Sequence, residues 1–190
     1  MLGQTEWRDI EPALDYAKQH GARQIVLIGW SNGASMALRL ASSSAHRKLI
    51  GGVIGISPVL DWANAIRLAA RGARLPGLIA ALALRALQAP GISSLLGAPE
   101  PLAFDDLAWT TTTVPTLLLH SAGDRTASYA DSVAFRDRNS GLVTLPDLPP
   151  TPHALEWNTD PERFARLVCD WIDQLAARAS TAPRNQQKPV

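Results

Sequence analysis

A serine stands between two glycines at the point where a short apolar run gives way to a helical pattern. The stretch over residues 24–35 reads Gln-Ile-Val-Leu-Ile-Gly-Trp-Ser-Asn-Gly-Ala-Ser. Its residues 25–28 are typical of a buried parallel strand, and the residues from 34 onward suit a helix. Strand, Gly-x-Ser-x-Gly and helix in this order are the layout of a nucleophile elbow, which presents the hydroxyl of Ser31 at a tight turn. The alternative is a glycine turn that matches the pattern by coincidence.

The glycines of this motif have a steric reason. In so tight a turn, a Cβ at Gly29 or at Gly33 is expected to collide with the neighbouring strand or helix, and the backbone of Ser31 is expected to be strained. A helix that begins at Asn32 directs free N–H groups toward whatever the serine attacks.

A serine hydroxyl needs a base to remove its proton, and the base needs an acid to hold its tautomer. In a protein with a nucleophile elbow the chain order is serine, acid, histidine. His20 and His46 precede every candidate acid that follows the elbow, and His120 precedes Asp124. His153 alone follows a credible acid, in a loop before the last predicted helix, so it is the candidate base. The alternative is a histidine of a surface loop.

Asp124 is the candidate acid because it follows the predicted strand over 114–120, at the carboxyl edge where α/β sheets place their sites. Asp61, which follows the strand predicted over 52–57, is the second candidate.

Composition limits the class of protein. The chain has 190 residues, of which 46% are hydrophobic and 18% charged, with a net charge of +1. These values fit one soluble domain with a real core, and the absence of a basic block gives no reason to expect a nucleic-acid partner. The single Cys169 excludes an internal disulfide and fits a reducing, cytoplasmic location. Its apolar helical surroundings predict a buried thiol.

No membrane span or signal peptide is expected. The longest apolar run, residues 75–84, has about half of the ~20 residues that a span needs. The first ten residues include three charged side chains and no apolar stretch.

Strand and helix patterns alternate along most of the chain, which predicts an α/β fold with a mostly parallel sheet. The alternation stops over residues 61–109, where helical pieces rich in Leu and Ala are broken by prolines. We interpret this segment as an inserted helical cap, with a pair of ordinary core helices as the alternative. Residues 1–60 and 110–179 then form the core, and residues 180–190 a disordered tail.

Together these motifs resemble the α/β-hydrolase superfamily over about residues 5–178. The likeness rests on Gly-Trp-Ser-Asn-Gly after a strand, on His-Ser-Ala-Gly-Asp-Arg-Thr over 120–126 and on Thr-Pro-His over 151–153. The segments over 58–62 and 153–158 are similar to peptidase- or esterase-like members with a helical cap. The resemblance implies that Ser31 is the nucleophile, Asp124 the acid and His153 the base. It also implies that the backbone N–H of Asn32 is one oxyanion-hole donor.

One departure from the family is large. Four strands normally precede the elbow strand, and a loop among them supplies the second oxyanion donor. Here only about twenty residues precede the elbow, so the resemblance implies a partial fold without its first strands. We therefore expect an exposed apolar edge on the elbow strand, which offers a surface for a homodimer. A start upstream of Met1, a fragment and a partner that supplies the missing strands are the possible explanations.

The function predicted from the sequence is that of a serine hydrolase that cleaves a small-molecule ester, thioester or amide. No metal or cofactor is implied, because His and Asp residues do not cluster at ligand spacing and no glycine-rich phosphate loop is present. Trp30, Trp62 and Trp157 are candidates for an apolar acyl pocket, although most such residues belong to a core. The alternatives are a truncated or degenerate hydrolase without catalysis and a cofactor-free haloperoxidase-like hydrolase.

Overall fold

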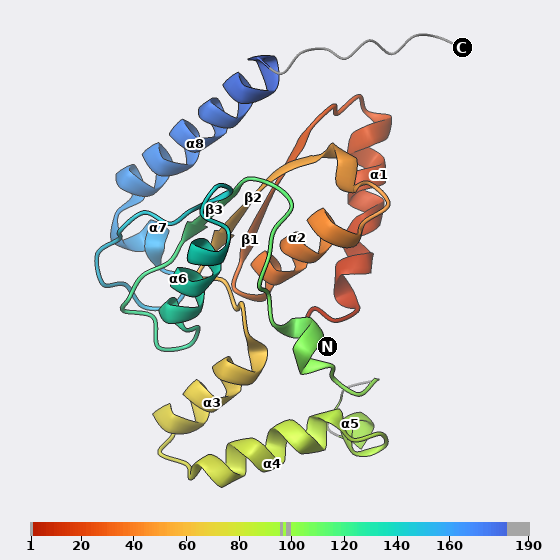
Figure 1. The fold of residues 1–190 in the computed structure, drawn as a ribbon, viewed down its shortest axis with the longest axis vertical. Helices are drawn as coiled ribbons and strands as arrows, with labels where there is room; N and C mark the ends of the chain where they lie inside the picture. Colours follow the sequence, from red (N-terminus) through yellow and green to blue (C-terminus); the bar gives the residue numbers. More distant parts are fainter. Residues whose placement is uncertain (1, 96, 98–99, 182–190) are drawn as a thin grey trace.

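A parallel β-sheet lies between helical layers in the computed structural model, which describes residues 2–95, 97 and 100–181 (Figure 1). Among these residues, four strands pair in the order in which they occur in the chain: β1 (Ile25–Trp30), β2 (Ile50–Ile56), β3 (Thr116–Leu119) and β4 (Val143–Thr144). Each neighbouring pair is parallel. The predicted α/β class with a mostly parallel sheet is confirmed, and each predicted strand lies within about two residues of its expected bounds.

Helices cover both faces of the sheet. One face packs against α1 (Glu11–Gln19), α2 (Asn32–Ser43) and α6 (Tyr129–Arg138), and the other against α8 (Pro161–Thr181). Figure 1 shows α1 and α2 on the opposite side of the strands from α8. Short elements complete the core: η1 (Glu6–Ile10), η2 (Arg47–Leu49) and α7 (Glu156–Thr159).

The alternation of side chains along the central strands explains the two-sided core. In β2, Val53 belongs to the α2 side, whereas Ile54 and Ile56 belong to the α8 side. In β3, Leu118 faces α2 and its neighbours on either side face α8. Successive side chains of a strand point to opposite faces, so apolar residues at every position bury a strand on both sides.

The elbow strand is only half covered. β2 is the only strand that pairs with β1 among the described residues. Ile28 and Trp30, which lie on the face toward α8, are 48% and 46% exposed. The predicted exposed apolar edge is therefore present, while association through it stays a prediction.

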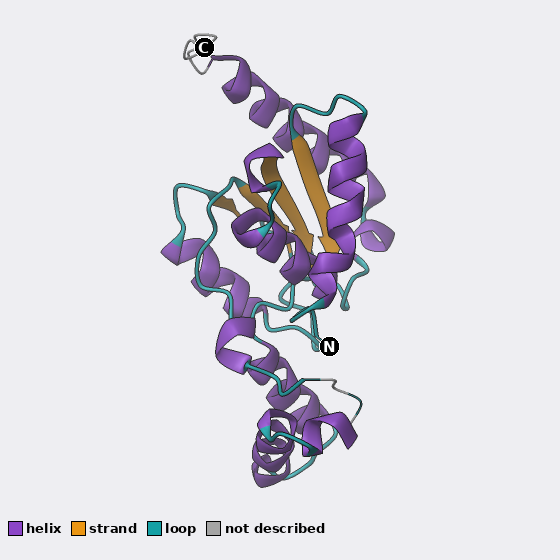
Figure 2. Ribbon diagram, turned by 90° about the vertical axis from the view of Figure 1, so that its right-hand side faces the viewer, coloured by secondary structure: helices purple, strands orange, loops and turns teal. Residues whose placement is uncertain are grey.

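The segment over residues 61–109 is helical and extends beyond the carboxyl end of the strands (Figure 2). Its elements are α3 (Trp62–Gly72), α4 (Gly77–Gln88), α5 (Ile92–Leu95) and η3 (Phe104–Leu107). A single antiparallel bridge between Asp61 and Ala108 joins its two ends, so the segment leaves and re-enters the core at one place. Its own small core gathers around Leu84, Phe104 and Leu107. That it acts as a cap over a site remains a prediction.

Three details differ from or lie outside the expectations. Cys169 is exposed rather than buried, because it lies on the side of α8 turned away from Trp171 and Leu175, which pack on the sheet. The expected tail over 180–190 falls outside the described residues from 182 onward, and its first two residues continue α8. Of the helices in the described part of the chain, none has the length and apolarity needed to cross a membrane.

The two glycines of the elbow are not equivalent, which corrects the steric expectation. A Cβ at Gly29 would lie 2.3 Å from the backbone carbon of Gly33, whereas a Cβ at Gly33 would meet no atom within 4 Å. Gly29 is required because the helix backbone crosses directly over the strand, and Gly33 faces open space.

We predict opposite effects on stability from the two alanine substitutions. Gly29→Ala pushes the backbone of α2 at Gly33 away from β1. Overpacking of this kind lowers the free energy of unfolding by about 1–3 kcal/mol or more. Gly33→Ala adds a methyl group to a helical residue that faces open space, so it raises the free energy of unfolding by up to ~1 kcal/mol. Urea unfolding followed by circular dichroism measures both. Equal stability of the two variants would contradict this account of the turn.

Candidate active site

Ser31 stands at the tip of a strained turn between β1 and α2. Its φ of 51° and ψ of −118° are rarely adopted by a residue with a side chain. The turn is held from both sides, because the Ser31 N–H donates to the carbonyl of Ile56 (2.8 Å) and the Ser31 carbonyl accepts from the N–H of Ala34 (3.1 Å). A strained backbone that neighbours fix in this way is a common device for presenting a functional side chain.

His153 connects Ser31 with Asp124. The Nε2 atom of His153 lies 2.9 Å from Ser31 Oγ, and its Nδ1 atom lies 2.7 Å from Asp124 Oδ2. A carboxylate only accepts, so Nδ1 carries the proton and the unprotonated Nε2 accepts from the serine hydroxyl. The structure thus brings together the three residues that the sequence selects. The imidazole is 22% exposed, so a reactant has access to it.

The Asp124 carboxylate accepts four hydrogen bonds and its side chain is buried. Oδ1 accepts from the backbone N–H groups of Thr126 (2.7 Å) and Ala127 (3.0 Å). Oδ2 accepts from His153 and, at 3.1 Å, from His120 Nε2. Burial alone would raise the pKa of this carboxyl, but the hydrogen bonds from two imidazoles and two amides outweigh it and hold the pKa well below its usual value. Asp124 is therefore ionised near neutral pH.

His120 is a member of this site that the sequence analysis missed. It is fully buried, with Nε2 toward Asp124 and Nδ1 at 2.7 Å from Ser132 Oγ on α6. In the neutral ring Nε2 donates to the carboxylate, so Nδ1 accepts from the Ser132 hydroxyl. Because the expected chain order is serine, acid, histidine, the sequence analysis rejected His120 as the base. The available signal was its place at a strand end, four residues before the candidate acid.

The loops that carry the acid and the base are joined through Ser121 and Gly123. Ser121 Oγ accepts from the N–H groups of Gly123 (3.0 Å) and Thr151 (2.7 Å) and donates to the carbonyl of Pro149 (2.9 Å). A Cβ at Gly123 would lie 2.6 Å from the backbone nitrogen of Thr151. Only a glycine permits this approach, which sets the distance between Asp124 and His153.

A second buried pair supports the loop after His153. Ser57, at the end of β2, has a φ of 44°, and Ala154 has a φ of 59°. Ser57 Oγ accepts from the Ala154 N–H (3.0 Å) and donates to Glu156 Oε1 (2.5 Å). Both strained residues are thereby tied to each other next to the histidine.

Asp61, the second candidate acid, has a structural role. Its Oδ1 accepts from the backbone N–H of Asn64 (2.8 Å), so it is the N-cap of α3. The structure brings Asp124 rather than Asp61 to the histidine.

Asn32 is the first residue of α2, so its backbone N–H has no intrahelical acceptor and lies next to Ser31. Its side-chain Oδ1 is buried without a hydrogen-bond partner in the described part of the chain, close to Gly3. The oxyanion-hole role of the backbone N–H stays a prediction.

The three candidate tryptophans lie in different surroundings. Trp30 precedes Ser31 and is half exposed. Trp62 begins α3 and packs on the apolar clusters around Phe104 and Val59. Trp157 is 49% exposed and contacts Phe164 edge-to-face. Their assignment to substrate binding stays a prediction.

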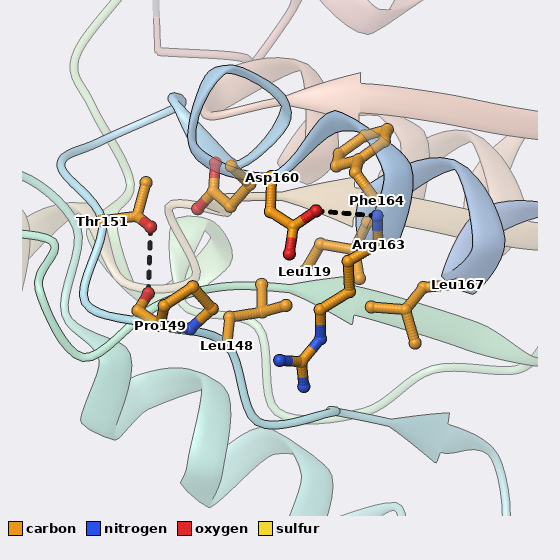
Figure 3. Close-up of a pocket in the computed structure, with 9 residues that line it drawn as sticks. Leu119, Leu148, Pro149, Thr151, Asp160, Arg163, Phe164 and Leu167 are labelled. Atoms are coloured by element: carbon orange, nitrogen blue, oxygen red, sulfur yellow. Dashed lines mark hydrogen bonds between the residues drawn. The ribbon is translucent and has the colours of Figure 1, made fainter.

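A small pocket opens on the α8 side (Figure 3). Its cavity volume is about 10 Å³, and Figure 3 shows Leu119, Leu148 and Leu167 along it. Glu156 lines it and has an Oε2 atom that is buried without a hydrogen-bond partner among the described residues. A more open hollow lies beside His153 and is lined by Arg125 and Pro152 as well. No three His, Cys, Asp or Glu side chains of the described residues are arranged to hold a metal ion.

Several solved structures with a similar fold are named as hydrolases. An esterase from Pyrococcus furiosus superposes with a TM-score of 0.64 at 18% identity, covering 92% of this chain and 63% of the esterase. The α/β-hydrolase domain-containing protein 10 from mouse gives 0.58 at 19% identity, over 90% and 71% of the two chains. A sugar hydrolase from Lactococcus lactis gives 0.64 at 16% identity, over 94% and 70%.

The fold is that of the α/β-hydrolases. The chain spans about 63% of the length of the Pyrococcus esterase, so it holds part of the arrangement that this neighbour has. No family model matches the sequence, and no curated protein matches it either.

We predict that His120→Leu destabilises the protein more than His120→Gln does. Leucine removes one donor from the buried Asp124 carboxylate and leaves the Ser132 hydroxyl without its acceptor, which lowers the free energy of unfolding by about 1–3 kcal/mol. Glutamine is the matched control, because its amide N–H can still donate to Asp124. Urea unfolding at pH 7 measures both variants. A leucine variant as stable as the unmodified chain would mean that His120 contributes nothing to holding Asp124.

Proposed function

We propose that this chain carries the catalytic triad of a serine hydrolase that cleaves an ester, thioester or amide through an acyl-enzyme. The observation that carries the proposal is the continuous hydrogen-bonded series from Ser31 Oγ through His153 to Asp124. It starts from a serine in the strained turn between a strand and a helix. The names of the fold neighbours support hydrolysis in general, and that of the Pyrococcus esterase supports hydrolysis of an ester.

The first half-reaction uses the serine as nucleophile. As Ser31 Oγ forms its bond to the substrate carbonyl carbon, His153 Nε2 takes the hydroxyl proton and the carbonyl oxygen becomes an oxyanion. The backbone N–H of Asn32 donates to that oxyanion. The tetrahedral intermediate then collapses to the acyl-enzyme, and the imidazolium returns its proton to the departing alcohol, thiol or amine.

In the second half-reaction, His153 takes a proton from water while the water oxygen attacks the acyl carbon. The carboxylic acid leaves and Ser31 Oγ regains its proton. Asp124 remains ionised throughout and stabilises the imidazolium formed in each half, which its lowered pKa favours. Each step balances with substrate and water alone.

The substrate class follows from the surroundings of the triad. Trp30, Trp62 and Trp157 are proposed to contact the apolar acyl part of a small molecule. The hollow that Arg125 and Pro152 line also contains His153, and we propose that the leaving group departs there.

The second candidate is a hydrolase fold without catalysis. Two points favour it: β1 pairs with one strand only among the described residues, and Asn32 is the one oxyanion donor that we predict. Loss of one such donor typically lowers turnover by ~10²–10³. The test of the nucleophile separates the two candidates.

We expect a fluorophosphonate probe to label the chain at Ser31. Ser31→Ala abolishes the labelling, because phosphonylation needs the activated hydroxyl. Ser42→Ala, an exposed serine of α2, is the matched control and keeps it. Gel fluorescence and mass spectrometry of the labelled peptide give the readout. Persistent labelling of Ser31→Ala, or no labelling of the unmodified chain, would sink the proposal.

Asp124→Asn is expected to lower turnover of a p-nitrophenyl ester by about 10⁴, as loss of a triad acid does when the histidine tautomer is no longer held. Asp61→Asn is the control, because asparagine caps a helix as well as aspartate. It should leave turnover within about twofold. The reverse ranking would assign the acid to the end of β2.

A further inference from the structure

The helical segment after β2 has an unusual charge distribution. Residues 62–99 contain four arginines and no aspartate or glutamate. The chain as a whole has 18 basic and 17 acidic residues, so this segment departs from the balance of the rest. A helical segment that is basic and apolar is typical of proteins that bind a membrane surface.

Helix α4 is apolar on two opposite faces. Its inner face, with Ala80 and Leu84, packs into the small core of the segment. On the outer face, Leu78 and Leu82 lie one turn apart and are 69% and 58% exposed. Leu75, just before α4, and Ile79 are 45% and 46% exposed. A helix that is apolar all round is normally buried on all sides, and α4 lies at an end of the molecule (Figures 1 and 2).

One arginine lies on this apolar face, and two more line the groove beside α4. Arg85 follows Leu82 by three residues and therefore lies on the same outer stripe. Arg67 and Arg71 of α3 line the groove between α3 and α4 together with Arg85, and Asp105 is the one carboxylate that lines it. No ion pair or hydrogen bond occupies these three guanidinium groups within the described residues. They are free to bind anionic groups outside the protein.

We propose that the outer face of α4 binds the surface of an anionic lipid bilayer. In this arrangement Leu75, Leu78, Ile79 and Leu82 enter the boundary between head groups and acyl chains. Arg85 contacts lipid phosphates, and Arg67 and Arg71 in the adjoining groove add electrostatic attraction to the anionic surface. Arginines near a charged bilayer contribute electrostatic attraction, and the aliphatic side chains add apolar burial. The proposal goes beyond the hydrolase function and does not depend on turnover.

A second copy of the chain fits this face less well. A two-fold symmetric contact through α4 would place the arginines of one copy near those of the other, with only Asp105 to offset them. An anionic bilayer offers the complementary charge without this repulsion.

Co-sedimentation of the full chain with lipid vesicles tests the proposal. We expect binding to phosphatidylcholine vesicles that contain roughly 30% phosphatidylglycerol and none to pure phosphatidylcholine. The double variant Leu78→Ser, Leu82→Ser should lower the partition coefficient at least ~10-fold, since it removes two apolar anchors. Arg67→Gln, Arg71→Gln and Arg85→Gln together should lower it about fivefold per arginine.

The matched control is the triple variant Lys18→Gln, Arg23→Gln, Arg138→Gln. It changes the net charge equally at exposed positions outside the helical segment, and it should bind almost as the unmodified chain does. Circular dichroism verifies the fold of each variant. A second readout uses a Cys169→Ser background with an NBD fluorophore at Leu82→Cys, and at Ser140→Cys as control. The fluorescence of the first label alone should rise on addition of anionic vesicles.

Three results would overturn the proposal. They are absence of binding to anionic vesicles, equal binding by the leucine variant, and an unchanged NBD signal at position 82. A dimer in solution that the leucine variant converts to a monomer would also overturn it, because a second copy would then occupy the face.

Discussion

The Asp124 carboxylate is the group on which the rest of the site depends. A buried charge is tolerated only where donors replace the water it has lost, and this one has four. Two come from the backbone of the turn that follows it, one from His120 just after β3, and one from His153 in the loop after β4. The carboxylate therefore joins three separate parts of the chain. Removal of any of these donors raises the pKa of Asp124 toward its usual value.

Of the five non-glycine residues with a positive φ in the described part of the chain, three lie around this network. Ser31, Ser57 and Ala154 all have positive φ values without being glycines, and each such residue costs about 1–3 kcal/mol. Hydrogen bonds offset the strain locally: the elbow is held by Ile56, and Ser57 and Ala154 hold each other. The hydroxyl of Ser57 also reaches Glu156, so the end of β2 and the start of α7 are fixed together. The strain thus lies where strands end and functional side chains begin.

The sequence predicted what depends on local pattern. The strands, the elbow and the order of Ser31, Asp124 and His153 follow from apolar runs and turn residues, and the fold class follows from their alternation. Contacts between distant segments were not accessible in this way. The orientation of His120 depends on a hydrogen bond with Ser132, which lies on the distant helix α6. Gly33 faces open space because no described segment packs against it. Cys169 is exposed because it lies on the side of α8 turned away from Trp171 and Leu175, which pack on the sheet.

The unequal support of the strands has a consequence for local opening. Among the described strands, β1 pairs with β2 only. The residues that hold Asp124 and His153 in place lie instead at the ends of β2 and β3 and in the loop after β4. Elements with few buried contacts open with less free energy than the whole domain needs to unfold. A partial separation of β1 from β2 would withdraw the serine while leaving the acid, both imidazoles and their loops in place. The N–H groups of β1 that point away from β2 have no strand partner among the described residues, so they should exchange with solvent faster than those of β3, which lies between two strands.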